Sequence, residues 1–489
     1  MESEPKENSE LLHKLHDVEL LNSDLPKPES NGVLRSSEAR GPPDGGFRAY
    51  SVLVGSFLTN GLLFGVINSC SVMYGVLEKQ TKEQGIENPE SKAALVGSLA
   101  VGITFLLSPL SGVLTALLGL RLTAVLGGGI ATVGLLLSSF VTSHVYALFF
   151  TYGVLYGVGA SLAYTPSLAI LGHYFKKYLG LVNGIVTIGS SVFTVIMPPL
   201  MDYLIKNHGL DWMFRVLAVF SLGIALCGLL FKPIPLMVLE KPLRKDNNIQ
   251  SLIKTIVNVQ IWKNSKYRFW ALSMPVALFG YFVPYVHIAE FVKQNFQGVD
   301  KSRVNLPLQS IALTSGLGRL TFGFLADKPG ADRILMQQIS FYVIGSLTII
   351  LPFVNSYWLV VVISAGMGIC DGAFIALIGP IAFDLCGGAH AAHAIGCMLG
   401  LAAAPLSIGP PVAAAIHGHT RSYTLPFVLA GISPLVGATL MFAIRLHSRG
   451  QKLEHEPNIN GRISPAPNEN EKLSALSRIP SKNGELTSL

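Results

Sequence analysis

The sequence predicts an all-α membrane protein with twelve transmembrane helices in two pseudo-symmetric bundles of six. Of its 489 residues, 50% are hydrophobic and only 13% are charged, whereas an ordinary soluble domain has roughly a quarter charged residues. Polar stretches divide the chain into about a dozen apolar runs of roughly 20 residues, the length that crosses a hydrocarbon core about 30 Å thick. Because lipid offers the backbone no hydrogen bonds, each run is expected to be helical.

The apolar runs give the positions of the helices. The predicted helices cover residues 49–75, 93–117, 121–141, 145–171, 179–204, 212–231, 269–293, 306–326, 333–353, 357–385, 389–416 and 423–446. An even number of spans places both chain termini on one side of the membrane. Most of the 49 glycines lie inside these runs, where glycine lets helices pack closely or bend.

A long polar segment, residues 232–268, separates an N-terminal bundle at 49–231 from a C-terminal bundle at 269–446. Such a division is typical of transporters that are built from two repeats. The segment is rich in Lys and Arg, and Lys176 and Lys177 follow the fourth helix. Because cytoplasmic loops carry an excess of Lys and Arg, both connections and both termini are expected to be cytoplasmic.

The two chain ends, residues 1–48 and 447–489, are rich in Glu, Ser, Asn, Lys and Pro and lack apolar periodicity. They are predicted to be disordered cytoplasmic tails. No cleavable signal peptide is expected, because the first apolar run follows a long polar leader. The net charge of +7 follows the membrane topology rather than a folded basic face, so nucleic acid is not expected as a partner.

Motifs of catalysis and of cofactor or metal binding were not found. The sequence has no phosphate-binding GxxxxGK[ST], no His-Glu-x-x-His and no nucleophile elbow. Its five cysteines lie in or beside apolar runs and lack metal-ligand spacing. We therefore expect neither an enzyme nor a bound cofactor or metal.

A weak internal sequence repeat, which we call the sequence echo, relates the ends of the second and eighth predicted helices. Small and charged residues recur there with nearly the same spacing, namely Gly112, Ala116, Gly119 and Arg121, and then Gly323, Asp327, Gly330 and Arg333. The echo supports a repeated architecture, in which small residues let neighbouring helices meet at the cytoplasmic face.

Two ionisable residues lie in the middle of apolar runs, Arg319 on the eighth helix and Asp371 on the tenth. A charge in the hydrocarbon core is costly, so each one is a candidate functional residue. In the functional interpretation, Arg319 binds a substrate carboxylate, and Asp371 neutralises Arg319 or receives a substrate amine. In the structural interpretation, the two form a buried ion pair that orders two helices.

The seventh helix carries His287 next to Pro284, which interrupts the helix. Aromatic residues surround this position, namely Phe279, Tyr281, Phe282 and Tyr285. A kinked helix with ring faces suits an aromatic substrate body, and the histidine could hydrogen-bond that substrate or carry a proton. The alternative is an interfacial histidine, with Glu290 one turn further along at the rim.

Three further polar residues are candidates for substrate binding. Arg215, near the start of the sixth helix, lies at the outer mouth or reaches inward by snorkelling. Asn68 on the first helix and Tyr164 on the fourth are uncharged polar groups on helices that are expected to form the gate.

Two segments give the chain a family resemblance. Asp-Gly-Gly-Phe at 44–47 opens the first helix, and Tyr-Phe-Lys-Lys-Tyr-Leu-Gly-Leu-Val-Asn-Gly at 174–184 opens the fifth. They resemble the two signatures of the monocarboxylate transporters, and the resemblance implies a major facilitator fold over all twelve helices. Proton-lactate members carry a lysine on the first helix and an aspartate one turn before the arginine of the eighth. This chain has Asn68 near the first position and Ser315 at the second.

Longer stretches, at 166–177, 180–187, 189–194 and 277–287, are similar to the branch that carries aromatic amino acids and thyroid hormones. That resemblance implies a plasma-membrane facilitator without obligatory sodium or proton coupling, and it assigns substrate binding to four residues, Arg215, His287, Arg319 and Asp371.

Two alternatives stay open at this point, proton-coupled symport of short monocarboxylates and a nontransporting nutrient receptor. The expected partners are a small-molecule substrate and the lipid bilayer. Smaller-substrate members of the family often travel with a single-span glycoprotein chaperone, and the sequence leaves open whether this chain needs one.

Overall fold

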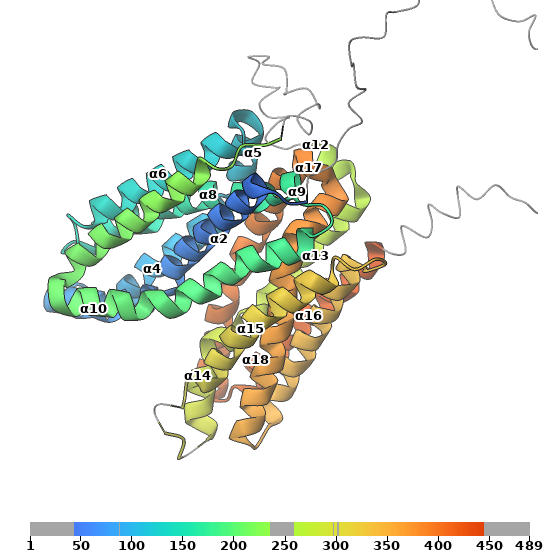
Figure 1. Ribbon diagram of the computed structural model, residues 1–489. Coiled ribbons are helices and arrows are strands. Elements are labelled where there is room, and N and C mark those ends of the chain that lie inside the picture. Colours follow the sequence, from blue (N-terminus) through green and yellow to red (C-terminus); the bar gives the residue numbers. More distant parts are fainter. Residues whose placement is uncertain (1–43, 88, 235–258, 297, 301–302, 445–489) are drawn as a thin grey trace, which may run out of the picture.

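All regular elements that the structure describes are helices (Figure 1). The computed structural model describes residues 44–87, 89–234, 259–296, 298–300 and 303–444. Nearly all of the two predicted tails and most of the predicted linker lie outside these ranges, so their boundaries stay predictions.

The first half of the described chain forms one group of helices, blue to green in Figure 1. Their bounds are α2 (Phe47–Asn68), α3 (Cys70–Glu83), α4 (Pro89–Leu106), α5 (Ser108–Leu118), α6 (Leu120–Ser138), α7 (Val145–Leu148), the π-helix η1 (Phe149–Tyr156), α8 (Gly157–Ala169), α9 (Leu171–Tyr174) and α10 (Leu179–Gly228). Helix α10 packs along α2 and α6, and α6 packs on α8.

The second half forms another group, yellow-green to red in Figure 1. Its bounds are α12 (Val259–Lys263), α13 (Ser265–Tyr281), α14 (Val283–Asn295), α15 (Leu306–Leu325), α16 (Arg333–Ile350), the 3-10 turn η3 (Leu351–Phe353), α17 (Tyr357–Thr420) and α18 (Thr424–Leu440). Helix α15 packs along α17, and α13, α16 and α18 pack on one another and on α17.

Each of the two longest helices contains one glycine in a non-helical conformation. The backbone of Gly209 in α10 has φ 86°, and that of Gly387 in α17 has φ 73°. This left-handed region is open to glycine and strained for other residues. Each glycine lies between two predicted helices, so α10 and α17 each correspond to a pair of spans that reverse direction at a very short turn.

Three predicted spans are interrupted, and prolines explain two of the interruptions. The predicted interruption at Pro284 is confirmed, because α13 ends at Tyr281 and Pro284 lies in the first turn of α14. The predicted span 93–117 is not straight, since its two parts are bent by 47° at Leu107, ahead of Pro109. Proline lacks an N–H donor and its ring blocks the preceding carbonyl, which breaks the helical ladder. The first predicted span is also broken, at Ser69, although no proline lies there.

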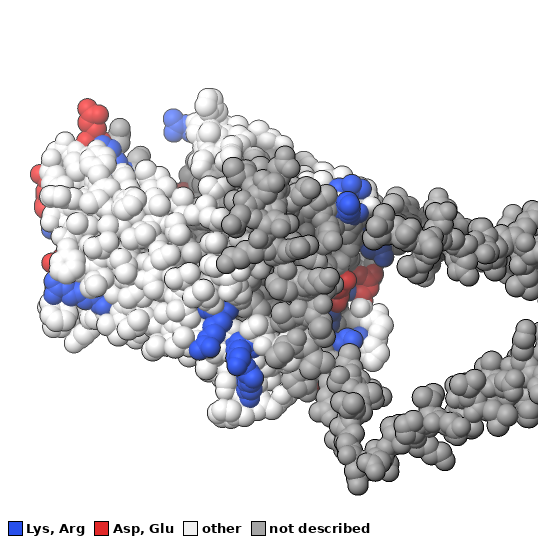
Figure 2. Space-filling model, turned by 90° about the horizontal axis from the view of Figure 1, so that it is seen from above, with Lys and Arg blue, Asp and Glu red and all other residues white. Residues whose placement is uncertain are grey.

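Eight helices in the described part of the chain are long and apolar enough to cross a membrane, or nine if the bent α4 and α5 count as one span. The predicted count of twelve is reached from nine when α10 and α17 are each counted as two spans, divided at their glycines, and α15 is counted as one more. Large apolar side chains cover the outside, and Val195, Leu313 and Val219 are 73%, 73% and 69% exposed. Figure 2 shows a mostly uncharged described surface, with Lys and Arg in small groups at its margins. Such a surface suits hydrocarbon rather than water.

The two groups of helices meet at one end of the molecule and diverge toward the other (Figure 1). At the closed end, which we call the gate end, Asp327 follows α15 and caps the start of α10. Its carboxylate accepts hydrogen bonds from the backbone N–H of Gly180 at 2.7 Å and of Leu181 at 2.8 Å. Arg333 contacts the same carboxylate at 3.1 Å and Asp384 at 2.8 Å.

The gate end is asymmetric, although the sequence echo suggests a repeat. The position in the first half that corresponds to Asp327 is occupied by Ala116, which has no carboxylate to cap a helix. Burial raises the pKa of Asp327, whereas the two capping amides and the Arg333 guanidinium lower it. A carboxylate at a helix N-terminus is favoured by the helix dipole, so Asp327 joins the two halves through one charged contact.

Replacing Asp327 by alanine is expected to loosen the gate end and to raise about tenfold the apparent KM for the small-molecule substrate that the family resemblance implies. Hydrogen bonds to a charged group each contribute roughly 1.5–3 kcal/mol. The apparent affinity for a ligand falls when a smaller fraction of the protein molecules is in the binding-competent state. The measurement is uptake kinetics, normalised to surface protein. Asp384→Ala is the matched control, because its half-exposed carboxylate contacts Arg333 but not α10. Equal KM values in the two variants would contradict the capping role.

Candidate functional site

Arg319 is the central residue of the candidate site. It lies on α15, faces α10 and is 7% exposed. Its Nη1 donates to the backbone carbonyl of Thr187 and, at 2.5 Å, to Oγ of Ser190. Its Nε is buried without a hydrogen-bond partner. The guanidinium therefore bridges the two halves of the molecule and keeps donors that are not yet used.

Asp371 is the second buried charge. It lies on α17, is 5% exposed and accepts hydrogen bonds from two hydroxyl groups, those of Tyr281 on α13 and Ser315 on α15. Two neutral donors thus hold this carboxylate in place.

The predicted ion pair between Arg319 and Asp371 is not formed. The ion pairs among the described residues include neither side chain. The physical reason is that Ser315, one helical turn before Arg319, fills the space at Asp371 together with Tyr281. Arg319 reaches instead toward the backbone of α10. Two interpretations are therefore wrong for this conformation, the one in which the two charges form a helix-ordering pair and the one in which Asp371 neutralises Arg319.

Helices α15 and α17 approach closely enough to join Ser315 to Asp371 because glycines lie between them. A Cβ on Gly372 would lie 2.2 Å from the Ser315 carbonyl oxygen, and one on Gly318 would lie 2.2 Å from that of Ile369. Both distances are far below van der Waals contact. Small residues are what allow helices in a membrane to pack backbone to backbone.

Aromatic rings approach Arg319 from both halves. Tyr164 on α8 is buried, and its ring packs edge-on to Phe64 at 5.0 Å and Phe105 at 6.5 Å. Across the interface, Tyr285 packs on Tyr281 at 5.3 Å. Tyr164 and Tyr285, one from each half, both lie within range of the Arg319 charge.

His287 lies elsewhere in the second half. Its Nε2 is 3.0 Å from the carbonyl oxygen of Pro410 on α17, and its ring is 5.9 Å from that of Tyr423. Glu290, predicted to lie at the rim, is exposed and pairs with Lys293 at 3.0 Å. The structure shows no contact between His287 and Arg319, so a binding role for the histidine stays a prediction.

Neither Arg215 nor Asn68 contacts Arg319 among the described residues, although Thr194, the partner of Asn68, bonds the carbonyl of Ser190 at 2.7 Å. The Arg215 guanidinium lies over the rings of Trp212 at 5.3 Å and Phe140 at 5.8 Å. Both rings are exposed, as expected for an arginine near a membrane interface. Asn68 donates to Thr194 of α10 at 3.0 Å. Their binding roles likewise stay predictions.

Sequence reasoning missed several residues around Arg319. Ser190 and the Thr187 carbonyl hold the guanidinium, Ser315 holds Asp371, and Phe64 and Phe105 build the ring cluster with Tyr164. Serine and threonine are common on buried helix faces, where many bond the carbonyl four residues back. No feature of the sequence separates Ser190 from those.

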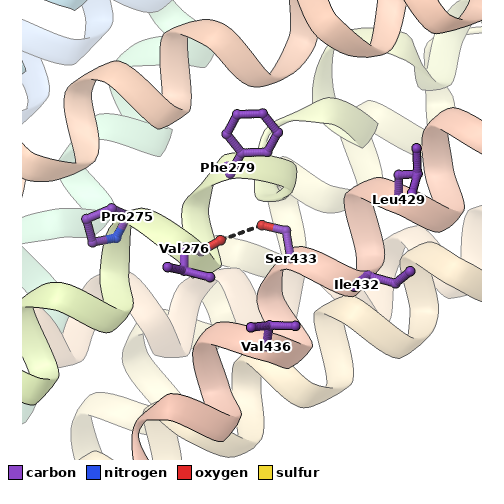
Figure 3. A pocket seen from close by; sticks show the side chains of 7 residues that line it. All are labelled: Pro275, Val276, Phe279, Leu429, Ile432, Ser433 and Val436. Atoms are coloured by element: carbon purple, nitrogen blue, oxygen red, sulfur yellow. Dashed lines mark hydrogen bonds between the residues drawn. The ribbon is translucent and has the colours of Figure 1, made fainter.

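One pocket on the described surface is lined by none of these charged residues. It has a volume of about 450 Å³ and lies between α13 and α18, where Ser433 bonds the Val276 carbonyl (Figure 3). Its lining is almost wholly apolar and lacks charged side chains. A site for a charged solute needs convergent polar groups, so we place the candidate site at Arg319 and not in this groove.

The fold and the buried charges define a membrane transporter of the major facilitator class. A family model described as Major Facilitator Superfamily matches residues 52–351 and 292–482. The human organic anion transporter MFSD10 aligns with a TM-score of 0.65 at 15% identity, covering 80% of this chain and 99% of that one. The E. coli fucose:proton symporter FucP aligns with a TM-score of 0.62 at 12% identity, covering 81% of this chain and 99% of that one, and a structure of FucP in the outward conformation gives the same values.

Relatives by sequence narrow the class. Monocarboxylate transporter 10 of Danio rerio is 42% identical over 424 residues, covering 85% of this chain and 82% of that protein. The human protein of the same name is 40% identical, covering 84% and 80%, and human monocarboxylate transporter 12 is 27% identical, covering 88% and 86%. The chain belongs to the monocarboxylate transporter family.

Proposed function

We propose that this transporter is a plasma-membrane facilitator of the aromatic amino acids tyrosine, tryptophan and phenylalanine, and also of thyroid hormones. It works by alternating access and needs neither sodium nor protons. The observation that carries the proposal is that Arg319 and Asp371 are both buried and that neither is paired with an opposite charge among the described residues.

An unpaired charge in a low-dielectric site is costly unless a ligand neutralises it. A zwitterionic amino acid supplies both missing partners, because its carboxylate pairs with Arg319 and its ammonium group with Asp371. Lactate supplies only the carboxylate and leaves Asp371 without a cation. The charge pattern therefore favours an amino acid over a short monocarboxylate.

The rings near Arg319 favour an aromatic side chain on that amino acid. Tyr164, Phe64 and Phe105 come from one half, and Tyr281 and Tyr285 from the other. Aromatic pairs prefer edge-on or offset packing at ring separations of about 4.5–7 Å. The rings of the two halves can pack in this way against the indole or phenol ring of a substrate. The resemblance to the branch that carries aromatic amino acids supports the same substrate class.

The basic residues of the predicted cytoplasmic connections support a cytoplasmic orientation of the gate end. With the gate end closed, the substrate site faces outward. Rocking of the two halves about Arg319 would then open the gate end and expose the site to the cytoplasm.

The proposal is tested by uptake of labelled tyrosine, tryptophan and lactate into cells that express the chain. Uptake is measured at two external pH values, with and without sodium. We expect tyrosine and tryptophan uptake that changes less than about twofold with pH or sodium. Lactate uptake that rises with acidity would favour proton symport instead. Absence of any flux, together with substrate-induced modification of the tails, would favour a receptor.

A further inference from the structure

The contacts of the Arg319 guanidinium leave one particular edge of it for a ligand. Nη1 carries two N–H groups, and it has two acceptors, the Thr187 carbonyl and Ser190 Oγ. Within the described part of the chain, these are the only hydrogen-bond acceptors of Arg319. Its Nε is buried without any.

The occupied Nη1 and the free Nε decide which of two modes of carboxylate binding Arg319 can use. A carboxylate can bind end-on, to Nη1 and Nη2, or side-on, to Nε and Nη2. The end-on mode needs a hydrogen of Nη1, and both are already taken. The side-on mode uses Nε, whose unsatisfied burial costs free energy until an acceptor arrives.

Ser190 is set up to keep the guanidinium in this orientation. Its hydroxyl donates to the Thr187 carbonyl at 2.9 Å, so its oxygen lone pair is directed to Arg319. The residue is 9% exposed. Helix α10 is also held tightly to α15 here, because a Cβ on Gly184 would lie 2.3 Å from the Arg319 carbonyl oxygen.

We propose that Ser190 is a positioning residue for substrate recognition, which anchors Nη1 of Arg319 to α10 and presents the Nε edge to the substrate carboxylate. This inference rests on the proposed function and deepens it. Arg319 belongs to α15 of the second half, and its guanidinium bonds α10 of the first half while it binds the substrate. The substrate carboxylate is therefore bound at the interface that must move during transport.

The test compares tryptophan uptake by the full chain with that by Ser190→Ala and Ser190→Thr, each normalised to surface protein. Removing a hydrogen bond to a charged group is expected to raise the KM of Ser190→Ala roughly tenfold, with the maximum rate changed less than twofold. Ser190→Thr keeps a hydroxyl and should restore the KM to within about threefold. Ser340→Ala is the matched control, since Ser340 is a buried serine on α16 whose one side-chain hydrogen bond among the described residues goes to the Met336 carbonyl.

A second readout separates positioning from a merely structural role. Tryptophanamide lacks the carboxylate, so its inhibition constant should differ less than about twofold between the unaltered chain and Ser190→Ala. An unchanged KM for tryptophan in Ser190→Ala, or an equal loss of affinity for tryptophan and its amide, would overturn the positioning role and leave the proposed function standing. If the unaltered chain carries no aromatic amino acid, the proposed function fails and this inference falls with it.

Discussion

Replacing Arg319 by lysine is expected to lower tryptophan uptake at least about 100-fold while the protein still reaches the cell surface. Lysine keeps the positive charge but lacks the planar fork, so it cannot hold the Thr187 carbonyl and Ser190 and also bind a carboxylate through two parallel bonds. Each charge-assisted bond that is lost contributes roughly 1.5–3 kcal/mol, and the loss of one or two of them corresponds to a fall in uptake of about 100-fold or more. The measurement is the initial uptake rate per surface-biotinylated protein.

Arg121→Lys is the matched control for this substitution. Arg121 lies at the start of α6 and is exposed, so the same change there should alter uptake less than twofold. Uptake by Arg319→Lys within twofold of the unaltered chain would show that the guanidinium fork is not needed, and the substrate site would then have to lie elsewhere.

Replacing Gly372 by alanine is expected to reduce surface protein about tenfold, with little uptake by what remains. The new Cβ would lie 2.2 Å from the Ser315 carbonyl oxygen and 2.6 Å from the Arg319 backbone nitrogen. These are backbone atoms, so α15 and α17 must move apart, and overpacking of this kind typically costs about 1–3 kcal/mol. The separation would also draw Ser315 away from Asp371.

Gly102→Ala provides the comparison, because nothing lies within 4 Å of a Cβ at that position on α4. It introduces the same methyl group into a membrane helix without a clash, and surface protein and uptake should stay near those of the unaltered chain. If the two variants behaved alike, the close approach of α15 and α17 would not be what positions the site.

Most of the fold follows from features that act locally along the chain. Apolar length predicts where helices lie, and Pro284 predicts the break between α13 and α14. The short turns at Gly209 and Gly387 fall between predicted helices, although the sequence does not reveal that their flanking helices run almost without interruption. The 47° bend at Leu107 does not follow from apolar length, because Pro109 stands inside an apolar run that is long enough for one straight helix.

The site was predictable only in part. Arg319, Asp371 and Tyr164 were identified as buried polar residues, because charge and hydroxyl groups stand out in apolar runs. Their partners were not, since the hydroxyls at Asp371 come from helices that are distant in sequence. Ser190 resembles every other buried serine until the structure places it against Arg319. Which donor meets which acceptor is decided by helix packing, which a single sequence does not encode in any local pattern.

The central claim is that this transporter moves aromatic amino acids down their gradient without a coupled ion. Reconstitution of the purified chain alone into proteoliposomes tests it most directly, because it also removes any glycoprotein chaperone. Labelled tryptophan is followed with and without an imposed proton or sodium gradient. We predict that tryptophan equilibrates to equal internal and external concentrations under all conditions and exchanges faster against internal tyrosine. Accumulation above equilibrium under a proton or sodium gradient would contradict the account.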